Sequence, residues 1–228
     1  IGTPIGFAML LLGFTGLVYL TSFSGAIQSI IDTPFLLISS YDYAVLPLFL
    51  FMASICFTTG LGKNLFRMAN CWLGRMHGGL CIATIGSCAI FGAASASGIA
   101  TAATIGTVAL PEMQRYKYDA GLAAGSVAAG GTLGIMIPPS GMLMIYGIIA
   151  GQDIGKLFIA GIVPGIVLSL MFIALIYGRV RLKPSLAPLG EKTNFRQKFL
   201  SIADSFEMII LILVVIGGLL IGWFTPTE

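Results

Sequence analysis

The fold depends most on a run of 34 residues without a charged side chain, 78–111, which reads GGLCIATIGSCAIFGAASASGIATAATIGTVALP. Arg75 precedes the run, and Arg115 and Lys117 follow it, so both flanks are basic. Near the middle, small and polar residues replace the bulky ones over 92–98 (GAASASG). Because glycine and serine weaken a helix interior and favour helix ends, the run predicts two helices joined at 92–98.

The amino-acid composition is that of a membrane protein. Hydrophobic residues make up 57% of the 228 residues and charged residues only 9%, against about a quarter charged in a soluble domain. The mean hydropathy is +0.99. So few charges do not cover a surface in water, and we therefore expect the lipid bilayer to surround the chain. A soluble enzyme and a disordered chain are excluded, and a net charge of +3 indicates no nucleic-acid partner.

The basic residues predict the topology. The charges leave six apolar stretches: 1–31, 43–62, 78–111, 120–152, 157–178 and 208–224. Eleven of the twelve basic residues form three clusters beside them: Lys63, Arg67 and Arg75; Arg115 and Lys117; and Arg179, Arg181, Lys183, Lys192, Arg196 and Lys198. The positive-inside rule places all three clusters in the cytoplasm. The remaining loops, with Asp32, Asp42 and Asp153, are then external.

Under this topology the run 78–111 leaves the cytoplasm and returns to it. A straight helix of that length is about 50 Å long, against a hydrocarbon core of about 30 Å. Two arms of about 17 residues each are at the lower limit for full spans. We therefore expect a re-entrant helical hairpin with its tip at 92–98. Two ordinary short spans are the alternative, although their external turn contains no charged residue.

Residues 120–152 predict a discontinuous helix. The stretch crosses once, because a basic cluster precedes it and Asp153 follows it. It contains GGTLGIMIPPSG at 130–141, in which Pro138 and Pro139 remove two backbone donors and proline clashes with the preceding helical turn. Non-helical backbone at membrane depth occurs only where it is buried in protein or lines a cavity.

The chemistry available at these two breaks is that of hydroxyls, carbonyls and helix ends. No Asp, Glu, His, Lys or Arg lies within 78–111 or 121–152, which argues against a proton relay there. No nucleophile–base set or metal-ligand cluster is apparent, so we expect no enzyme and no cofactor. A half-helix N-terminus suits a carboxylate, and unwound carbonyls with hydroxyl oxygens suit sodium. The available hydroxyls are those of Ser95, Ser97, Thr101, Thr104, Thr132 and Ser140.

These residues carry a resemblance to a known family. The chain resembles the large membrane subunit (M, DctM-like) of tripartite ATP-independent periplasmic (TRAP) transporters in the order and spacing of its motifs. The similar segments are FGAASAS at 91–97 with ATAATIG at 100–106, PEM at 111–113, YD at 118–119, GGTLGIMIPPS at 130–140, IYG at 145–147, LFIAGIVPG at 157–165 and FTPTE at 224–228. One departure is Ala96, where the family usually has glycine between the two serines.

The resemblance implies an all-α polytopic membrane protein, an elevator-type secondary transporter built from two inverted repeats. The chain would be mainly the first repeat, part of a longer protein. Its partners would be a small membrane subunit and a periplasmic substrate-binding protein, in a bacterial or archaeal inner (cytoplasmic) membrane. Its substrate would be an organic anion, such as a C4-dicarboxylate or a sialic acid, coupled to sodium. A related ion-coupled carboxylate symporter without a binding protein is the alternative.

The same resemblance implies the site residues. Ser95 and Ser97 at the hairpin tip would bind sodium together with the carbonyls of Gly134 and Pro138. Residues near the substrate carboxylate would be Gly98, Thr132, Pro139 and Ser140.

The expected organisation follows from these assignments. It comprises N-terminal spans with an external connector (1–62), a cytoplasmic basic connector (63–77), the re-entrant hairpin (78–111), the broken helix (120–152), a transmembrane helix (157–178), a cytoplasmic connector (179–203) and a last transmembrane helix (208–224) that leads to the second repeat.

Cysteine labelling tests the topology of the hairpin. In the full-length protein without its native cysteines, cysteines placed at Arg75 and Arg115 should both react with a membrane-impermeant maleimide from the cytoplasmic face, because both flanks are basic. Inside-out vesicles and intact spheroplasts provide the two faces. Labelling of the two positions from opposite faces would exclude a hairpin.

Overall fold

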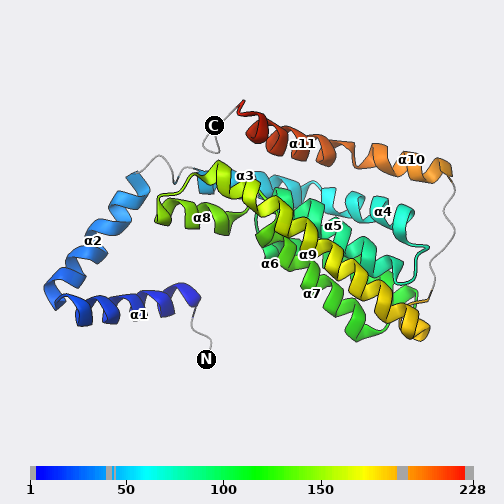
Figure 1. Ribbon diagram of the computed structural model, residues 1–228, viewed down its shortest axis with the longest axis horizontal. Helices are drawn as coiled ribbons and strands as arrows, with labels where there is room; N and C mark the ends of the chain where they lie inside the picture. The colour runs from blue at the N-terminus through cyan, green and yellow to red at the C-terminus, as the bar shows by residue number, and fades with distance from the viewer. Residues whose placement is uncertain (1–3, 40–42, 44, 189–194, 224–228) are drawn as a thin grey trace. The chain divides into compact units, whose positions relative to one another are not determined.

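The computed structural model describes residues 4–39, 43, 45–188 and 195–223, and within these ranges all regular structure is helical (Figure 1). The all-α prediction is confirmed for this part of the chain. Asp42, Lys192 and the motif 224–228 lie outside the described residues. The chain divides into two compact units, 1–44 and 45–228.

The first unit is a helical pair, α1 (Ile5–Leu20) and α2 (Phe23–Ser39). Its turn is closed by the Thr21 hydroxyl, which donates to the Leu17 carbonyl at 2.8 Å. Asp32, which we expected in an external loop, instead lies inside α2, so its expected place in a loop is wrong. Its carboxylate accepts a hydrogen bond of 2.9 Å from the Gln28 amide one turn earlier, so the helix continues through it.

The second unit contains the other helices. They are α3 (Val45–Thr58), α4 (Leu61–Leu73), α5 (Gly79–Ser95), α6 (Gly98–Arg115), α7 (Ala120–Met136), α8 (Gly141–Ala150), α9 (Ile154–Leu182), the short 3-10 helix η2 (Pro184–Leu186), α10 (Phe195–Asp204) and α11 (Phe206–Ile221). Helices α5, α7 and α9 lie side by side, and α5 also packs on α4 and α6 (Figure 1).

Two expected connectors are partly helical. Most of 63–77 belongs to α4, because its apolar residues recur at helical spacing: Leu61, Leu65 and Ala69 are buried, whereas Lys63 and Arg67 are exposed. In 179–203, α9 continues to Leu182, and α10 begins at Phe195. Basic side chains in the last turn of α9 favour this extension, since they interact well with a helix C-terminus.

Several helices are long and apolar enough to cross a bilayer. Within the described ranges these are Ala120–Ala150 and Ile154–Leu182, and there are up to four if each bent helix pair counts as one span. The bent pairs are α3 with α4, at 64°, and α10 with α11, at 55°. Helix α9 exposes large apolar side chains such as Val163, Leu170 and Met171. These features are those of a polytopic membrane protein.

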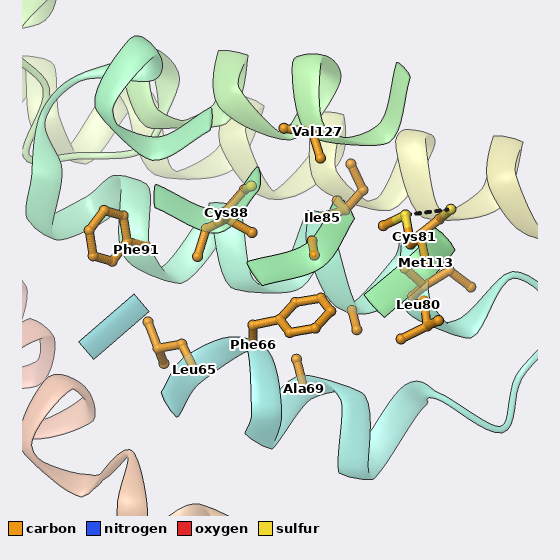
Figure 2. Close-up of a cluster of buried hydrophobic side chains, with 14 of the residues drawn as sticks. Leu65, Phe66, Ala69, Leu80, Cys81, Ile85, Cys88, Phe91, Met113 and Val127 are labelled. Atoms are coloured by element: carbon orange, nitrogen blue, oxygen red, sulfur yellow. Dashed lines mark hydrogen bonds between the residues drawn. The ribbon is translucent and has the colours of Figure 1, made fainter. Parts of the chain in front are cut away.

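Helix α5 forms the centre of the second unit. Its side chains Ile85, Cys88 and Phe91 are fully buried. Figure 2 shows Leu65, Phe66 and Ala69 of α4 along one side of α5, with Val127 of α7 opposite. Toward the right of the view, the Cys81 thiol lies 3.9 Å from the Met113 sulfur of α6. Apolar packing on all sides therefore holds the two hairpin arms to α4 and α7.

Glycines bring the hairpin and α7 into backbone contact. A Cβ atom added to Gly92 would lie 2.6 Å from the Cα of Gly134, and one added to Gly98 would lie 2.7 Å from the Gly131 carbonyl oxygen. Contacts under 3.0 Å are not tolerated by real Cβ atoms. Small residues at helix interfaces permit such close approach in membrane proteins. Glycine is therefore required here by the space between the helices.

Two substitutions in the same helix test this packing. Gly92→Ala should destabilise the full-length protein by about 1–3 kcal/mol, because the new methyl group meets backbone that does not yield. Gly86→Ala is the control, since its nearest neighbour would be a leucine methyl at 3.9 Å. It should stabilise the protein by about 0.5–1 kcal/mol through the lower entropy of the unfolded chain. Thermal unfolding in detergent measures both, and equal effects would refute the close approach.

Candidate ion and anion site

The hairpin tip consists of two residues, Ala96 and Ser97. Helix α5 ends at Ser95, and Ala96 takes up the left-handed conformation (φ 51°) while its N–H donates to the Gly92 carbonyl at 3.1 Å. Ser97 is extended, and its hydroxyl oxygen accepts a hydrogen bond of 3.3 Å from the Ala100 N–H. Ser97 is thus the N-cap of α6. The tip lies inside the small-residue run 92–98.

The second break separates α7 from α8. Ile137 is extended, and with Pro138 and Pro139 it ends α7 at Met136. Ser140 is the N-cap of α8, because its hydroxyl oxygen accepts from the Leu143 N–H at 3.4 Å. The same hydroxyl donates to the Ile135 carbonyl. One buried serine therefore joins the end of α7 to the start of α8.

The hairpin tip and this break meet. The N–H of Gly141 donates to the Ala96 carbonyl at 3.3 Å, which links the start of α8 to the tip. On the other side, a Cβ atom at Gly134 would lie 3.0 Å from the Ser97 carbonyl oxygen and 2.6 Å from the Thr101 hydroxyl. The two interruptions of helical structure therefore form one region of irregular backbone.

A cluster of oxygen atoms occupies this region. The hydroxyls of Ser95 and Thr101 are 2.6 Å apart, and the two side chains are 1% and 0% exposed. Each is also within hydrogen-bond distance of the Ser97 carbonyl oxygen, Thr101 at 2.8 Å and Ser95 at 3.2 Å. Hydroxyl oxygens have two acceptor lone pairs. Ser95 and Thr101 thus keep lone pairs for a ligand, although neither side chain can ionise.

Helix ends determine the electrostatics. The C-terminal ends of α5 and α7, at Ser95 and Met136, carry partial negative charge, and the N-terminal ends of α6 and α8, at Gly98 and Gly141, carry partial positive charge. Broken helices in transporters use these ends for cations and anions respectively. In the described part of the chain, no three His, Cys, Asp or Glu side chains gather as a metal site. The region therefore suits an alkali cation and a carboxylate.

The structure places the expected site residues unequally. Ser95, Ser97 and Gly134 lie together, and Gly98 begins α6 beside them. Thr132 points elsewhere: it is exposed, and its hydroxyl donates to the Ala129 carbonyl at 2.7 Å. It lines a separate open cavity of about 560 Å³ that it shares with Gly98.

The two prolines have their rings on the far side of the break. Pro138 and Pro139 line a small cavity with Phe158 of α9 and Leu219 of α11. A Cβ atom added to Gly161 of α9 would lie 3.2 Å from the Pro138 ring. Their side chains therefore pack α7 and α8 against α9, which leaves only their backbone for the tip.

Thr101 is a member of the cluster that the sequence did not single out. It is one of the six available hydroxyls, but the resemblance implies a role for the hydroxyl residues Ser95, Ser97, Thr132 and Ser140 and none for Thr101. Its signal is its spacing: Thr101 is four residues after Ser97, so it lies one turn into α6 on the face of the N-cap. A hydroxyl at that position points back along α6 toward the tip, where it donates to the Ser97 carbonyl.

A cavity of about 390 Å³ opens beside the tip. Helix α3 contributes Leu46, Phe49 and Leu50 to its wall. The tip and the break contribute Ala96, Ser97, Gly98 and Gly141. Most of the remaining lining is aliphatic or methionine side chain. The start of α6 is thus accessible from a mainly apolar space.

The fold and the two breaks define the class, a helical polytopic membrane protein with a hairpin tip packed on a broken helix. The family model of the tripartite ATP-independent periplasmic transporter, DctM component, matches residues 1–228. The chain belongs to this family, and the resemblance seen in the sequence is confirmed.

Several relatives are similar along the chain. The C4-dicarboxylate TRAP transporter large permease protein DctM of Pseudomonas aeruginosa is 35% identical over 95% of this chain and 51% of its own length. The isethionate TRAP transporter permease protein DctMQ of Oleidesulfovibrio alaskensis is 32% identical over 100% of this chain and 35% of its own. The sialic acid TRAP transporter permease protein SiaT of Haemophilus influenzae is 30% identical over 100% and 36%. The chain thus spans about half the length of these relatives or less.

A double-mutant cycle tests the oxygen cluster. Ser95→Ala and Thr101→Val should each destabilise the full-length protein by about 1–3 kcal/mol, because each leaves a buried partner without its hydrogen bond. Together they should cost about 0.5–1.5 kcal/mol less than the sum of the two, since they share one bond. Ser87→Ala replaces a buried hydroxyl of α5 that donates to the Ala83 carbonyl one turn earlier, and paired with Thr101→Val it should be additive. Additivity of the first pair in thermal unfolding would contradict the cluster.

Proposed function

We propose that the protein is the large permease part of a TRAP transporter, a secondary active transporter that imports an organic anion together with sodium. The family match supports this proposal. The names of the relatives specify C4-dicarboxylate, isethionate and sialic acid, which are all organic acids. The proposed substrate is therefore an organic acid with at least one anionic group.

The observation that carries the proposal is the junction of the tip with the broken helix. Buried hydroxyls at Ser95 and Thr101 lie where two helix C-termini converge. Sodium would bind to these oxygens, to Ser97 and to the Gly134 and Pro138 carbonyls. Partial negative charge from the helix ends stabilises a cation there without a carboxylate. Sodium is preferred to protons as the coupling ion because none of these groups titrates in the physiological range.

The substrate would bind next to the ion. The N-terminal ends of α6 and α8, at Gly98 and around Ser140 close to the Pro139 backbone, carry partial positive charge that would attract an anion. Thr132 would take part only through the neighbouring cavity that it shares with Gly98. Sodium and a carboxylate at adjacent helix ends attract each other, which couples the two binding events.

The proposed mechanism is of the elevator type. The hairpin, α7 and α8 are joined by backbone contacts and by the Ala96–Gly141 hydrogen bond, so they would move as one body carrying ion and substrate. A periplasmic binding protein would deliver the substrate, and a small membrane subunit would complete the permease in the inner membrane. The tripartite name of the family supports both partners.

The hydroxyl of Ser97 tests ion coupling in the assembled full-length transporter. Ser97→Gly should weaken apparent sodium affinity in proteoliposome uptake by roughly ten- to hundredfold, since a lost ligand in a dry site costs about 1–3 kcal/mol. Glycine is chosen because it is a tolerated N-cap, and its effect on stability should be only a few tenths of a kcal/mol.

The control for this experiment is Ser169→Ala, because the Ser169 hydroxyl donates to the Gly165 carbonyl within α9. It should leave sodium affinity unchanged. Unchanged sodium affinity in Ser97→Gly would remove the tip from the ion site. Uptake driven equally well by a proton gradient without sodium would refute sodium coupling, and uptake independent of added binding protein would favour a simpler symporter.

A further inference from the structure

The end of α7 leaves two backbone carbonyls without their helical donors. In an α-helix, the carbonyl of each residue accepts from the N–H of the residue four positions later, and proline has no N–H. Four positions after Gly134 is Pro138, and four positions after Ile135 is Pro139. Two consecutive prolines therefore remove the donors of two consecutive carbonyls at the end of one helix.

The hydroxyl of Ser140 replaces one of these donors. The Ser140 side chain is 0% exposed, and its hydroxyl donates to the Ile135 carbonyl. The same oxygen accepts from the Leu143 N–H at 3.4 Å. A serine hydroxyl has one proton to donate, and a carboxylate can only accept. Because that proton is used within the protein, the Ser140 hydroxyl has none left for the carboxylate of a substrate.

The other carbonyl, that of Gly134, belongs to a residue in contact with the hairpin tip. A Cβ atom added to Gly134 would lie 3.0 Å from the Ser97 carbonyl oxygen and 2.6 Å from the Thr101 hydroxyl. Within the described residues, no backbone N–H outside the helices donates to the Gly134 carbonyl, and the helical donor is missing because residue 138 is proline. A carbonyl without a donor at a helix C-terminus suits a cation.

We infer that Ser140 is a positioning residue for the ion site and that its side chain is not a ligand of the substrate. By holding the Ile135 carbonyl, Ser140 keeps the last turn of α7 in the conformation that places Gly134 against the tip. This inference rests on the proposed function, because it takes the Gly134 carbonyl as a sodium ligand. It concerns the Ser140 side chain alone, so the partial positive charge at the start of α8 stays available to the substrate.

Sodium titration of the purified full-length permease, without substrate, tests the inference. Sodium chloride replaces choline chloride at constant ionic strength, and the rise of the thermal midpoint gives an apparent dissociation constant for sodium. Ser140→Ala should raise this constant about tenfold, because the last turn of α7 loses the hydrogen bond that holds it. Ser140→Gly should do the same with a smaller effect on folding, since glycine is a tolerated N-cap. Ser140→Thr keeps a hydroxyl and should stay within about threefold of the wild type.

The matched control is Ser126→Ala. Ser126 is also a buried serine of α7, and its hydroxyl donates to the Ala123 carbonyl at 2.8 Å. This variant should leave the sodium constant unchanged, and an equal loss in Ser126→Ala and Ser140→Ala would overturn the inference.

The remaining outcomes separate the inference from the proposed function. Sodium stabilisation of the wild type with the same constant in Ser140→Ala would refute the positioning role alone, even if the variant unfolds at a lower temperature in choline chloride. A wild-type protein that gains no stability from sodium over choline would refute sodium binding, and the proposed sodium coupling would fail with it.

Discussion

The contact between Gly92 and Gly134 is the constraint on which the rest of the second unit depends. With a Cβ atom at Gly92 only 2.6 Å from the Gly134 Cα, the two helices are as close as backbone allows. That approach places the end of α5 beside the end of α7, and only then do Ala96 and Gly141 come within hydrogen-bond distance. Each irregular segment has backbone groups whose exposure to lipid without a hydrogen bond would be costly. Through the Gly141–Ala96 hydrogen bond the two segments satisfy some of these groups for each other.

The arrangement separates packing from polarity along a single hairpin. Toward its N-terminal end, α5 packs apolar side chains such as Ile85 against apolar neighbours such as Phe66 of α4 (Figure 2). Toward the tip the side chains become small, and hydroxyls replace methyl groups at Ser95 and Thr101. Since glycines rather than bulky residues hold the tip to α7, the polar atoms of the tip come close to the α7 backbone.

The sequence is informative where composition changes sharply. The helix ends at Ser95 and Met136 both fall in runs rich in glycine, serine or proline, and the membrane class follows from the scarcity of charge. The prediction of a loop at Asp32 failed because a carboxylate at the end of an apolar stretch is typical of a loop. In the structure, Gln28 one turn earlier donates a hydrogen bond to this carboxylate within a helix. The position of Thr101 at the tip, and of Thr132 away from it, depends on how α6 and α7 are rotated against each other, and local patterns do not contain that rotation.

Ala96 gives the tip a property that glycine at this position would not. At φ 51° an alanine is held in a conformation that costs an L-residue about 1 kcal/mol or more, whereas glycine reaches it freely. Alanine has fewer accessible backbone conformations than glycine. A tip with alanine therefore loses less conformational entropy if a ligand orders it. The tip is thus preorganised by its backbone chemistry, with the strain carried by the packing of α5, α6 and α7 around it.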